Sequence, residues 1–368
     1  MKHFAWFDSL RFLAVLLVMF SHSWDLTGSL PGISGWLYHW IREMGWIGVD
    51  FFFVLSGFLV SGLLFAEYKA TGNVRGKRFL IRRAFKILPL FYVLVLVAAV
   101  MSVAVGEASG MKLAGRIFRE ACFFQSYRRA MFPHTWSLAV EVHFYLLLAG
   151  MFYLLLRCNK IHSEKLQKLP WILLGVLVFC LSARLIQCGL EPSRFNFFKQ
   201  LNPSHLRVDS LAAGVLLRYL YDFEPQCLSI FARFRIAWVG LAVVMLWPAT
   251  QLWLPHSWYV TALIPTSCYL SGIIILAQLA DLPWPAAGWG RALAWLPDYL
   301  GRHSYAIYLW HLAAKDWLVA RIFAGHSTFI LTLAYFAAAF VVGCLLSEVL
   351  EMPMLRLRNR LFPSQIKK

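Results

Sequence analysis

Long apolar runs separated by short polar segments dominate the chain. Runs long enough to cross a bilayer as a helix, about 20 residues, are predicted at 9–26, 46–66, 87–105, 136–156, 170–190, 207–221, 236–254, 258–280, 304–322 and 328–350. The connections 67–86 and 106–135 are long enough for short helices at the membrane surface. The pattern predicts an all-α, polytopic membrane protein with about ten transmembrane helices. Residues 1–368 are expected to form one membrane-embedded domain with a short cytoplasmic tail at 351–368.

The composition supports this prediction. Apolar residues make up 60% of the 368 residues and charged residues only 14%, against about 25% charged in soluble domains. A soluble domain of this length has no way to cover so much apolar surface. The seven cysteines are scattered and contain no C-x-x-C pair, so neither a disulfide framework nor a metal site is expected.

The charge balance predicts an orientation. The chain has 35 Lys and Arg against 18 Asp and Glu. In a soluble protein this excess would suggest a nucleic-acid partner, but in a membrane protein Lys and Arg gather in cytoplasmic connections. The densest basic connection is 67–86. Placing this connection inside the cell puts both termini in the cytoplasm. We therefore expect a multi-pass protein of the cell (inner) membrane, with membrane lipids as partners and no nucleic acid. The oligomeric state stays open.

The first predicted span contains two ionisable residues, Arg11 and His22. An ionisable group inside a membrane costs about 2.5–3.5 kcal/mol, so each needs a compensating reason. The separation on an α-helix is about 16.5 Å of rise and roughly three turns, so both side chains share one helix face. Arg11 alone fits a snorkelling anchor, and His22 alone fits a hydrogen-bonded packing residue. Their shared face favours a functional site.

Acidic residues reach a depth comparable to that of His22. Asp50 begins the second span, Glu141 lies about one turn into the fourth, and Asp209 starts the sixth, two residues after Arg207. A histidine with a nearby carboxylate has the parts of an oriented general base. The alternative is structural, an Arg–Asp pair and helix caps at the outer interface, and it weighs most for Arg207 and Asp209.

The basic connection also carries a more specific possibility. Arg82, Arg83 and Lys86 fall on roughly one helical face and precede Pro89. Arg supplies forked donors to phosphate oxygens and Lys supplies a point charge, so the segment fits a site for a phosphorylated ligand. The simpler interpretation is the orientation signal described above.

These segments together resemble the acyltransferase-3 family of bacterial membrane acyltransferases. The matching motifs follow in family order and span residues 7–353: Phe7-Asp8-Ser9-Leu10-Arg11 with His22, the run from Gly48 to Leu59, Arg82-Arg83-Ala84-Phe85-Lys86, the run from Trp136 to Glu141, Arg207-x-Asp209 with Gly214, Ser304-Tyr305 with Tyr308 to His311, and Ser347 with Glu351 and Pro353. Two positions depart from the family pattern. Lys86 replaces an Arg, and Val142-His143 replaces an acidic residue followed by Gln.

The resemblance implies transfer of an acyl group, most often acetyl, from cytosolic acyl-CoA as co-substrate to a hydroxyl of a cell-surface carbohydrate or lipid-linked glycan. In this picture Arg11, Arg82, Arg83 and Lys86 bind the charged end of CoA. His22 is the general base, with Glu141 or Asp50 orienting it. Arg207, Asp209 and His311 are expected on the acceptor side, His311 either as a second site histidine or as a packing residue.

A transporter or flippase is the alternative from another class, because intramembrane His, Arg and Glu also build substrate and proton pathways. The sequence shows no matching pair of Gly/Pro-broken spans, which disfavours an inverted-repeat carrier. A non-catalytic assembly protein would leave the alignment of Arg11 and His22 without a purpose. The acceptor, the length of the acyl group, and direct transfer against an acyl-enzyme all stay open.

Overall fold

The computed structural model describes residues 4, 6–26, 29–106, 109–129, 131–158, 166–190, 196–251, 258–280, 282 and 289–363. Within these residues the regular structure is entirely helical, which confirms the all-α prediction. Both chain ends, including the last five residues of the predicted tail, lie outside the described residues.

The first half of the chain forms α1 (Phe7–Ser21), α2 (Gly32–Met44), η1 (Gly45–Ile47), α3 (Gly48–Thr71), α4 (Gly76–Ala104), α5 (Gly110–Ala121), α6 (Trp136–Cys158) and α7 (Leu169–Leu190). The middle forms α8 (Phe197–Gln200), η3 (Ser204–Leu206), α9 (Val208–Phe223), η4 (Pro225–Leu228), α10 (Ser229–Arg233), α11 (Arg235–Met245), η5 (Trp247–Gln251) and α12 (Trp258–Leu279). The last part forms α13 (Trp289–Arg302), α14 (Ser304–Ala313), the π-helical turn η6 (Ala314–Val319), α15 (Ala320–Ile322), α16 (Thr328–Leu346), the π-helical turn η7 (Ser347–Glu351) and α17 (Met352–Leu361).

Six helical stretches of the described chain are long and apolar enough to cross a membrane. They are Gly32–Thr71, Gly76–Ala104, Trp136–Arg157, Leu169–Leu190, Ala262–Leu279 and Thr328–Leu361. Pro225–Arg233 and Arg235–Thr250, bent by 88° at their break, count as a seventh if they form one span. The predicted count of about ten is therefore not confirmed. Helices α1 and α9 have only 15 and 16 residues, short of the roughly 20 that a full crossing needs.

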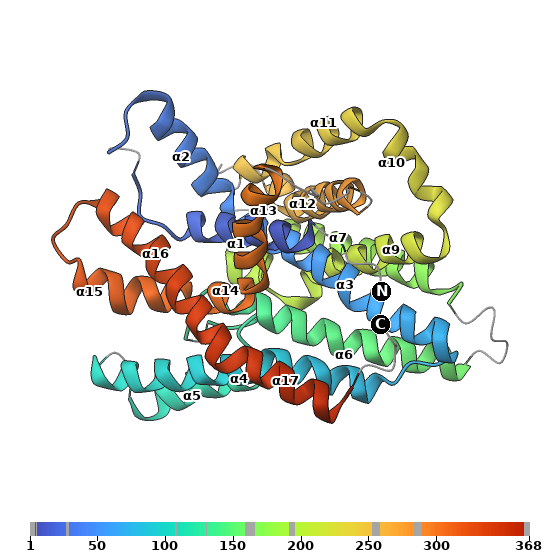
Figure 1. Ribbon diagram of the computed structural model, residues 1–368, viewed down its shortest axis with the longest axis horizontal. Helices are drawn as coiled ribbons and strands as arrows, with labels where there is room; N and C mark the ends of the chain where they lie inside the picture. The colour runs from blue at the N-terminus through green and yellow to red at the C-terminus, as the bar shows by residue number, and fades with distance from the viewer. Residues whose placement is uncertain are drawn as a thin grey trace.

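The two short helices α1 and α9 lie in the middle of the protein. Helices α1, α3, α9 and α14 occupy the middle of the view in Figure 1, with α4, α5 and α17 along one side and α10 and α11 along the other. Helix α3 packs closely against α9. A Cβ at Gly57 would lie 2.0 Å from the Leu211 carbonyl oxygen, and one at Gly214 would lie 2.0 Å from that of Val54. Because only glycine lacks this atom, the pair sets how closely the two backbones approach.

The connection 67–86 differs from the prediction. Helix α3 continues to Thr71 and stops at Gly72, whose φ of +67° is the left-handed conformation that ends many helices. Helix α4 then begins at Gly76 and runs unbroken through Pro89. The basic residues 82–86 therefore belong to the first turns of a spanning helix and not to a separate surface helix. The other long connection, 106–135, does carry a short helix, α5, as predicted.

Candidate active site

Two cavities lie side by side between the central helices. The polar lining of the Arg11 cavity is Arg11, Ser56, Arg83, Lys86, Thr135, Ser137, Glu141, Tyr145, Arg302, Ser304, Tyr305 and Tyr308. The polar lining of the His22 cavity is Ser21, His22, Arg42, Glu43, Trp46, Arg129, His134, Trp136, Asn202, Arg207 and Tyr308. Val49 and Tyr308 line both cavities. These two side chains form a shared wall.

His22 is held by the end of its own helix. It is the C-cap of α1, and its Nδ1 lies 2.9 Å from the Val18 carbonyl oxygen. A carbonyl oxygen only accepts hydrogen bonds, so in a neutral imidazole Nδ1 carries the hydrogen and Nε2 is the bare, basic nitrogen. The His22 carbonyl oxygen accepts a hydrogen bond of 2.6 Å from Lys315 Nζ. The ring is thus oriented by backbone, with its basic nitrogen left available.

Two further histidines continue from His22, each ring meeting the next edge-on. The His311 ring centroid lies 5.1 Å from that of His22 and 4.7 Å from that of His134. Both added histidines are buried, and each uses one nitrogen on a carbonyl: His311 Nδ1 on Tyr308 at 2.5 Å and His134 Nε2 on Leu309 at 3.1 Å. Their other nitrogens, His311 Nε2 and His134 Nδ1, have no hydrogen-bond partner. The structure therefore places His311 beside His22.

His134 was missed by the sequence prediction. It lies in the connection before α6, where helical periodicity gives no information. The available signal was its position directly before the Thr135-Trp136-Ser137 start of the fourth predicted span. Burial, together with the neighbouring His22, lowers the pKa of His134 to about 3. This imidazole is therefore neutral at physiological pH.

The Glu141 carboxylate forms its hydrogen bonds within the Arg11 cavity. Its carboxylate accepts hydrogen bonds from Ser56 Oγ at 2.6 Å and from the Tyr145 hydroxyl. The two hydroxyl oxygens are themselves 2.8 Å apart. Glu141 thus belongs to a polar cluster with Ser56 and Tyr145, across the shared wall from His22. The predicted role of orienting His22 is filled in the structure by the Val18 carbonyl.

Asp50 takes a different partner from the one predicted. Arg207 Nη2 lies 3.0 Å from both carboxylate oxygens of Asp50, and Ser210 Oγ donates to the same carboxylate at 2.8 Å. Asp50 is fully buried, and Arg207 is 1% exposed. An ion pair buried this deeply needs good geometry to offset the desolvation of both charges. Asp50 therefore ties α3 to the start of α9.

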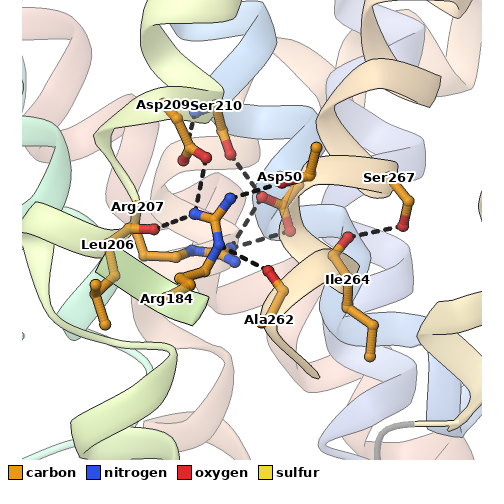
Figure 2. Close-up of polar contacts among 10 residues, drawn as sticks. Asp50, Arg184, Leu206, Arg207, Asp209, Ser210, Ala262, Ile264 and Ser267 are labelled. Carbon is orange, nitrogen blue, oxygen red and sulfur yellow. Dashed lines mark hydrogen bonds and ion pairs between the residues drawn. The ribbon is translucent and has the colours of Figure 1, made fainter. Parts of the chain in front are cut away.

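Asp209 pairs with Arg184, which the sequence prediction did not single out. Arg184 Nη1 lies 2.7 Å from Asp209 Oδ2, Nε donates to the Ala262 carbonyl at 2.9 Å, and Nη2 donates to Thr266 at 2.7 Å. The predicted pair of Arg207 with Asp209 is thus replaced by two crossed pairs that join α3, α7 and α9 (Figure 2). A lone Arg inside the predicted span 170–190 was the signal for Arg184.

Arg207 differs from Arg184 in having side-chain nitrogens without a hydrogen-bond partner. Its Nε and Nη1 are buried and have no hydrogen-bond partner. Its guanidinium lies over the Trp136 ring, 5.4 Å from the centroid, and it lines the His22 cavity. Unpaired buried donors are uncommon in folded proteins. Arg207 therefore carries unused binding capacity into this cavity.

Three of the four residues predicted to bind CoA line the Arg11 cavity. Arg11 pairs with Asp8 at 2.5 Å. Arg83 lies over the Phe79 and Tyr145 rings, 5.8 Å from each centroid, with an unpartnered Nε. Lys86 is paired with the buried Glu351.

Arg82 points elsewhere. It donates to the Phe362 carbonyl and, at 3.4 Å, to Asn359 Oδ1. These contacts hold the end of α17 against α4. Arg82 does not belong to the described lining of the Arg11 cavity.

A chain whose described part is entirely helical, with several membrane-length helices and charged side chains in two internal cavities, is a multi-pass membrane protein. A family model described as an acyltransferase domain matches residues 4–350, so the chain belongs to the acyltransferase-3 family. The family prediction from the motifs is confirmed.

The chain is also similar to curated relatives. It is 26% identical to the peptidoglycan O-acetyltransferase OatA of Listeria monocytogenes, over 83% of this chain and 48% of the relative. It is 26% identical to the putative O-acetyltransferase SACOL0978 of Staphylococcus aureus, over 85% and 51%. It is 25% identical to the putative peptidoglycan O-acetyltransferase YrhL of Bacillus subtilis, over 83% and 47%. The chain thus spans about half the length of these relatives. No solved structure matches it significantly.

Proposed function

We propose that the protein is a membrane O-acyltransferase that moves an acyl group, most simply acetyl, from acyl-CoA to a hydroxyl of a cell-surface carbohydrate or lipid-linked glycan. The observation that carries this proposal is the pair of cavities with different chemistry on the two faces of the Val49–Tyr308 wall. Cations line both cavities, and among the described lining residues the histidines belong to the His22 cavity, where His22 has a free basic nitrogen. The names of the relatives, which are O-acetyltransferases, support the reaction class.

The donor fits the Arg11 cavity. Arg11, Arg83 and Lys86 bring positive charge to its lining, and guanidinium and ammonium groups are the usual protein ligands of phosphates. Arg83 has an unused donor at Nε, so it has the capacity to bind a phosphate without giving up a protein contact. Lys86 is already paired with Glu351 and contributes mainly to the local field.

The reaction fits the His22 cavity. The thioester end of the donor has to reach past the Val49–Tyr308 wall to His22. His22 Nε2 accepts the proton of the acceptor hydroxyl as the hydroxyl oxygen attacks the thioester carbon. The carbon–sulfur bond then breaks, the sulfur leaves with the bonding electrons, and His22 returns the proton to it. The products are an ester and a free thiol, so the step balances without a further reactant. The Val18 carbonyl holds the ring in the tautomer that this step needs.

The orientation of the protein in the membrane follows from the location of the acyl donor. Because acyl-CoA is cytosolic, we place the Arg11 cavity toward the cytoplasm of the cell's inner membrane, with both termini on that side. Cysteine at Lys77 or at Lys112, each introduced alone into a chain without its native cysteines, tests this with a membrane-impermeant thiol reagent on intact cells. Both positions are exposed. We expect labelling at 112 and not at 77, and the reverse pattern would overturn the orientation.

The activity test uses inside-out membrane vesicles and acetyl-labelled acetyl-CoA. An acyltransferase releases free CoA and moves the label onto membrane-associated glycan, and His22→Ala should abolish both. A transporter would instead change the distribution of labelled molecules across the membrane and release no CoA. CoA release that does not depend on His22 would overturn the proposed site.

A further inference from the structure

The acceptor side of the site contains a buried cation with hydrogen-bond donors to spare. Arg207 is 1% exposed and lines the His22 cavity. Its Nη2 is occupied by Asp50, while Nε and Nη1 have no partner. A guanidinium binds an anion through charge-assisted hydrogen bonds, which are stronger than those to a neutral oxygen. The arrangement provides for a ligand group that bears negative charge.

Arginines outnumber acidic residues among the described lining of this cavity. Arg42 and Arg129 line it together with Arg207, and Glu43 is the acidic residue among the described lining. Glu43 Oε1 lies 3.1 Å from Arg42 Nη1, so these two charges match each other, and Arg207 is paired with Asp50. Arg129 lies over the Phe198 ring, 5.9 Å from the centroid. The lining therefore keeps a net positive charge, which favours ligands of negative charge.

We propose that the His22 cavity selects an acceptor that carries an anionic group, a carboxylate or a phosphate, and that Arg207 binds this group. The proposal rests on the proposed function, since it identifies the chemical class of acceptor for that site. The anionic group has two possible sources. It is either a carboxylate on the sugar itself or the phosphate that links a glycan to its lipid carrier. In either case Arg207 anchors the acceptor while His22 faces its hydroxyl.

Arg184 supplies a matched control. It is as deeply buried as Arg207, belongs to the same set of crossed ion pairs, and is also paired with an aspartate (Figure 2). Its three nitrogens all have partners in the protein, and it is not among the described residues that line the His22 cavity. A purely structural role of Arg207 predicts that the two arginines behave alike. A binding role predicts that they differ.

The test measures binding to the full chain in nanodiscs without acyl-CoA. Thermophoresis gives dissociation constants for three probes: a neutral N-acetylhexosamine trisaccharide, the same trisaccharide with one carboxylate, and a polyprenyl phosphate. We expect the wild type to bind one of the charged probes at least tenfold more tightly than the neutral one, and the tighter charged probe identifies the source. Arg207→Lys should lose most of this preference, because it lacks the free guanidinium donors. Arg184→Lys should keep it.

The outcomes are separable from failure of the proposed function, because no acyl transfer is needed for binding. Equal affinity of the wild type for all three probes would overturn the proposal. So would an equal loss of preference in the two lysine variants. If Arg207→Lys fails to fold, the binding preference of the wild type still tests the proposal. That preference should disappear when the probe's carboxylate is converted to a methyl ester or the polyprenyl phosphate is replaced by the neutral polyprenol, because the charge is then lost at nearly the same size. A preference that survives this change would count against an anion site.

Discussion

The Arg11 cavity and the His22 cavity share a wall but differ in how far their polar groups are already satisfied. In the Arg11 cavity Glu141 is bonded to Ser56 and Tyr145, and Lys86 is paired with Glu351. Arg83, with its free Nε, is the exception.

In and beside the His22 cavity, several buried side chains have a nitrogen without a hydrogen-bond partner. His134 Nδ1 and Arg207 Nε lack a partner, and so does Nε2 of His311, whose ring meets that of His22 edge-on. Buried polar groups are normally paired, so paired groups read as positioning and unpaired groups as binding or chemistry. This difference separates residues that the sequence motifs group together.

We expect the largest effect on stability from Asp50, whose carboxylate is paired with Arg207. Asp50→Ala leaves the buried charge of Arg207 without its partner, and breaking such a pair costs about 3–5 kcal/mol. We expect a correspondingly large loss in the free energy of unfolding, measured by denaturant titration of the purified protein. Asp298→Ala removes the partner of Arg302, which is 51% exposed, so it should cost less than about 1 kcal/mol. Equal small costs would return Asp50 to the list of catalytic candidates.

The next effect belongs to the basic nitrogen of His22. His22→Ala should fold normally and lose acyl transfer by at least the roughly 10²-fold that removal of a general base causes. Turnover of labelled acetyl-CoA in vesicles measures it, with thermal unfolding as the check on folding. The exposed His326, which bonds only locally to Phe323, is the control, and His326→Ala should match the wild type. Unchanged turnover in His22→Ala would leave His22 as a packing residue.

Arg83 should affect donor binding more than chemistry. A phosphate contact hardly changes during acyl transfer, so losing it raises the Michaelis constant and spares the turnover number. Because a hydrogen bond to a charged group contributes about 1.5–3 kcal/mol, Arg83→Ala should raise the acyl-CoA requirement about tenfold or more. Donor titrations measure both constants. A fall in turnover alone, with an unchanged donor requirement, would contradict the assignment.

Arg82 should give the smallest effect, although it is adjacent in sequence. Its contacts run to the end of α17 and not to the Arg11 cavity. We expect Arg82→Ala to leave the donor requirement within about twofold, because the residue shares only the long-range field. The donor titration used for Arg83→Ala measures this requirement. Equal effects of the two variants would mean that the motif acts as a single charge cluster.

Much of the protein could be predicted from its sequence. Helix content and membrane character follow from apolar runs and composition, because backbone groups in lipid must be satisfied within a helix. The family follows from motifs in order. Arg11, Arg83 and Lys86, which the sequence prediction groups together, line one cavity.

The tertiary structure alone decided the number of membrane-length helices and the partner of each charge. Hydropathy cannot distinguish a helix surrounded by lipid from one surrounded by protein, so the short buried α1 and α9 read as spans. The partners of Asp50, Asp209 and Glu141 depend on how helices far apart in sequence are rotated and how closely they approach. The Gly57–Gly214 contact between α3 and α9 is one such determinant. Spacing along a single helix carries no information about the face that a neighbouring helix presents to it.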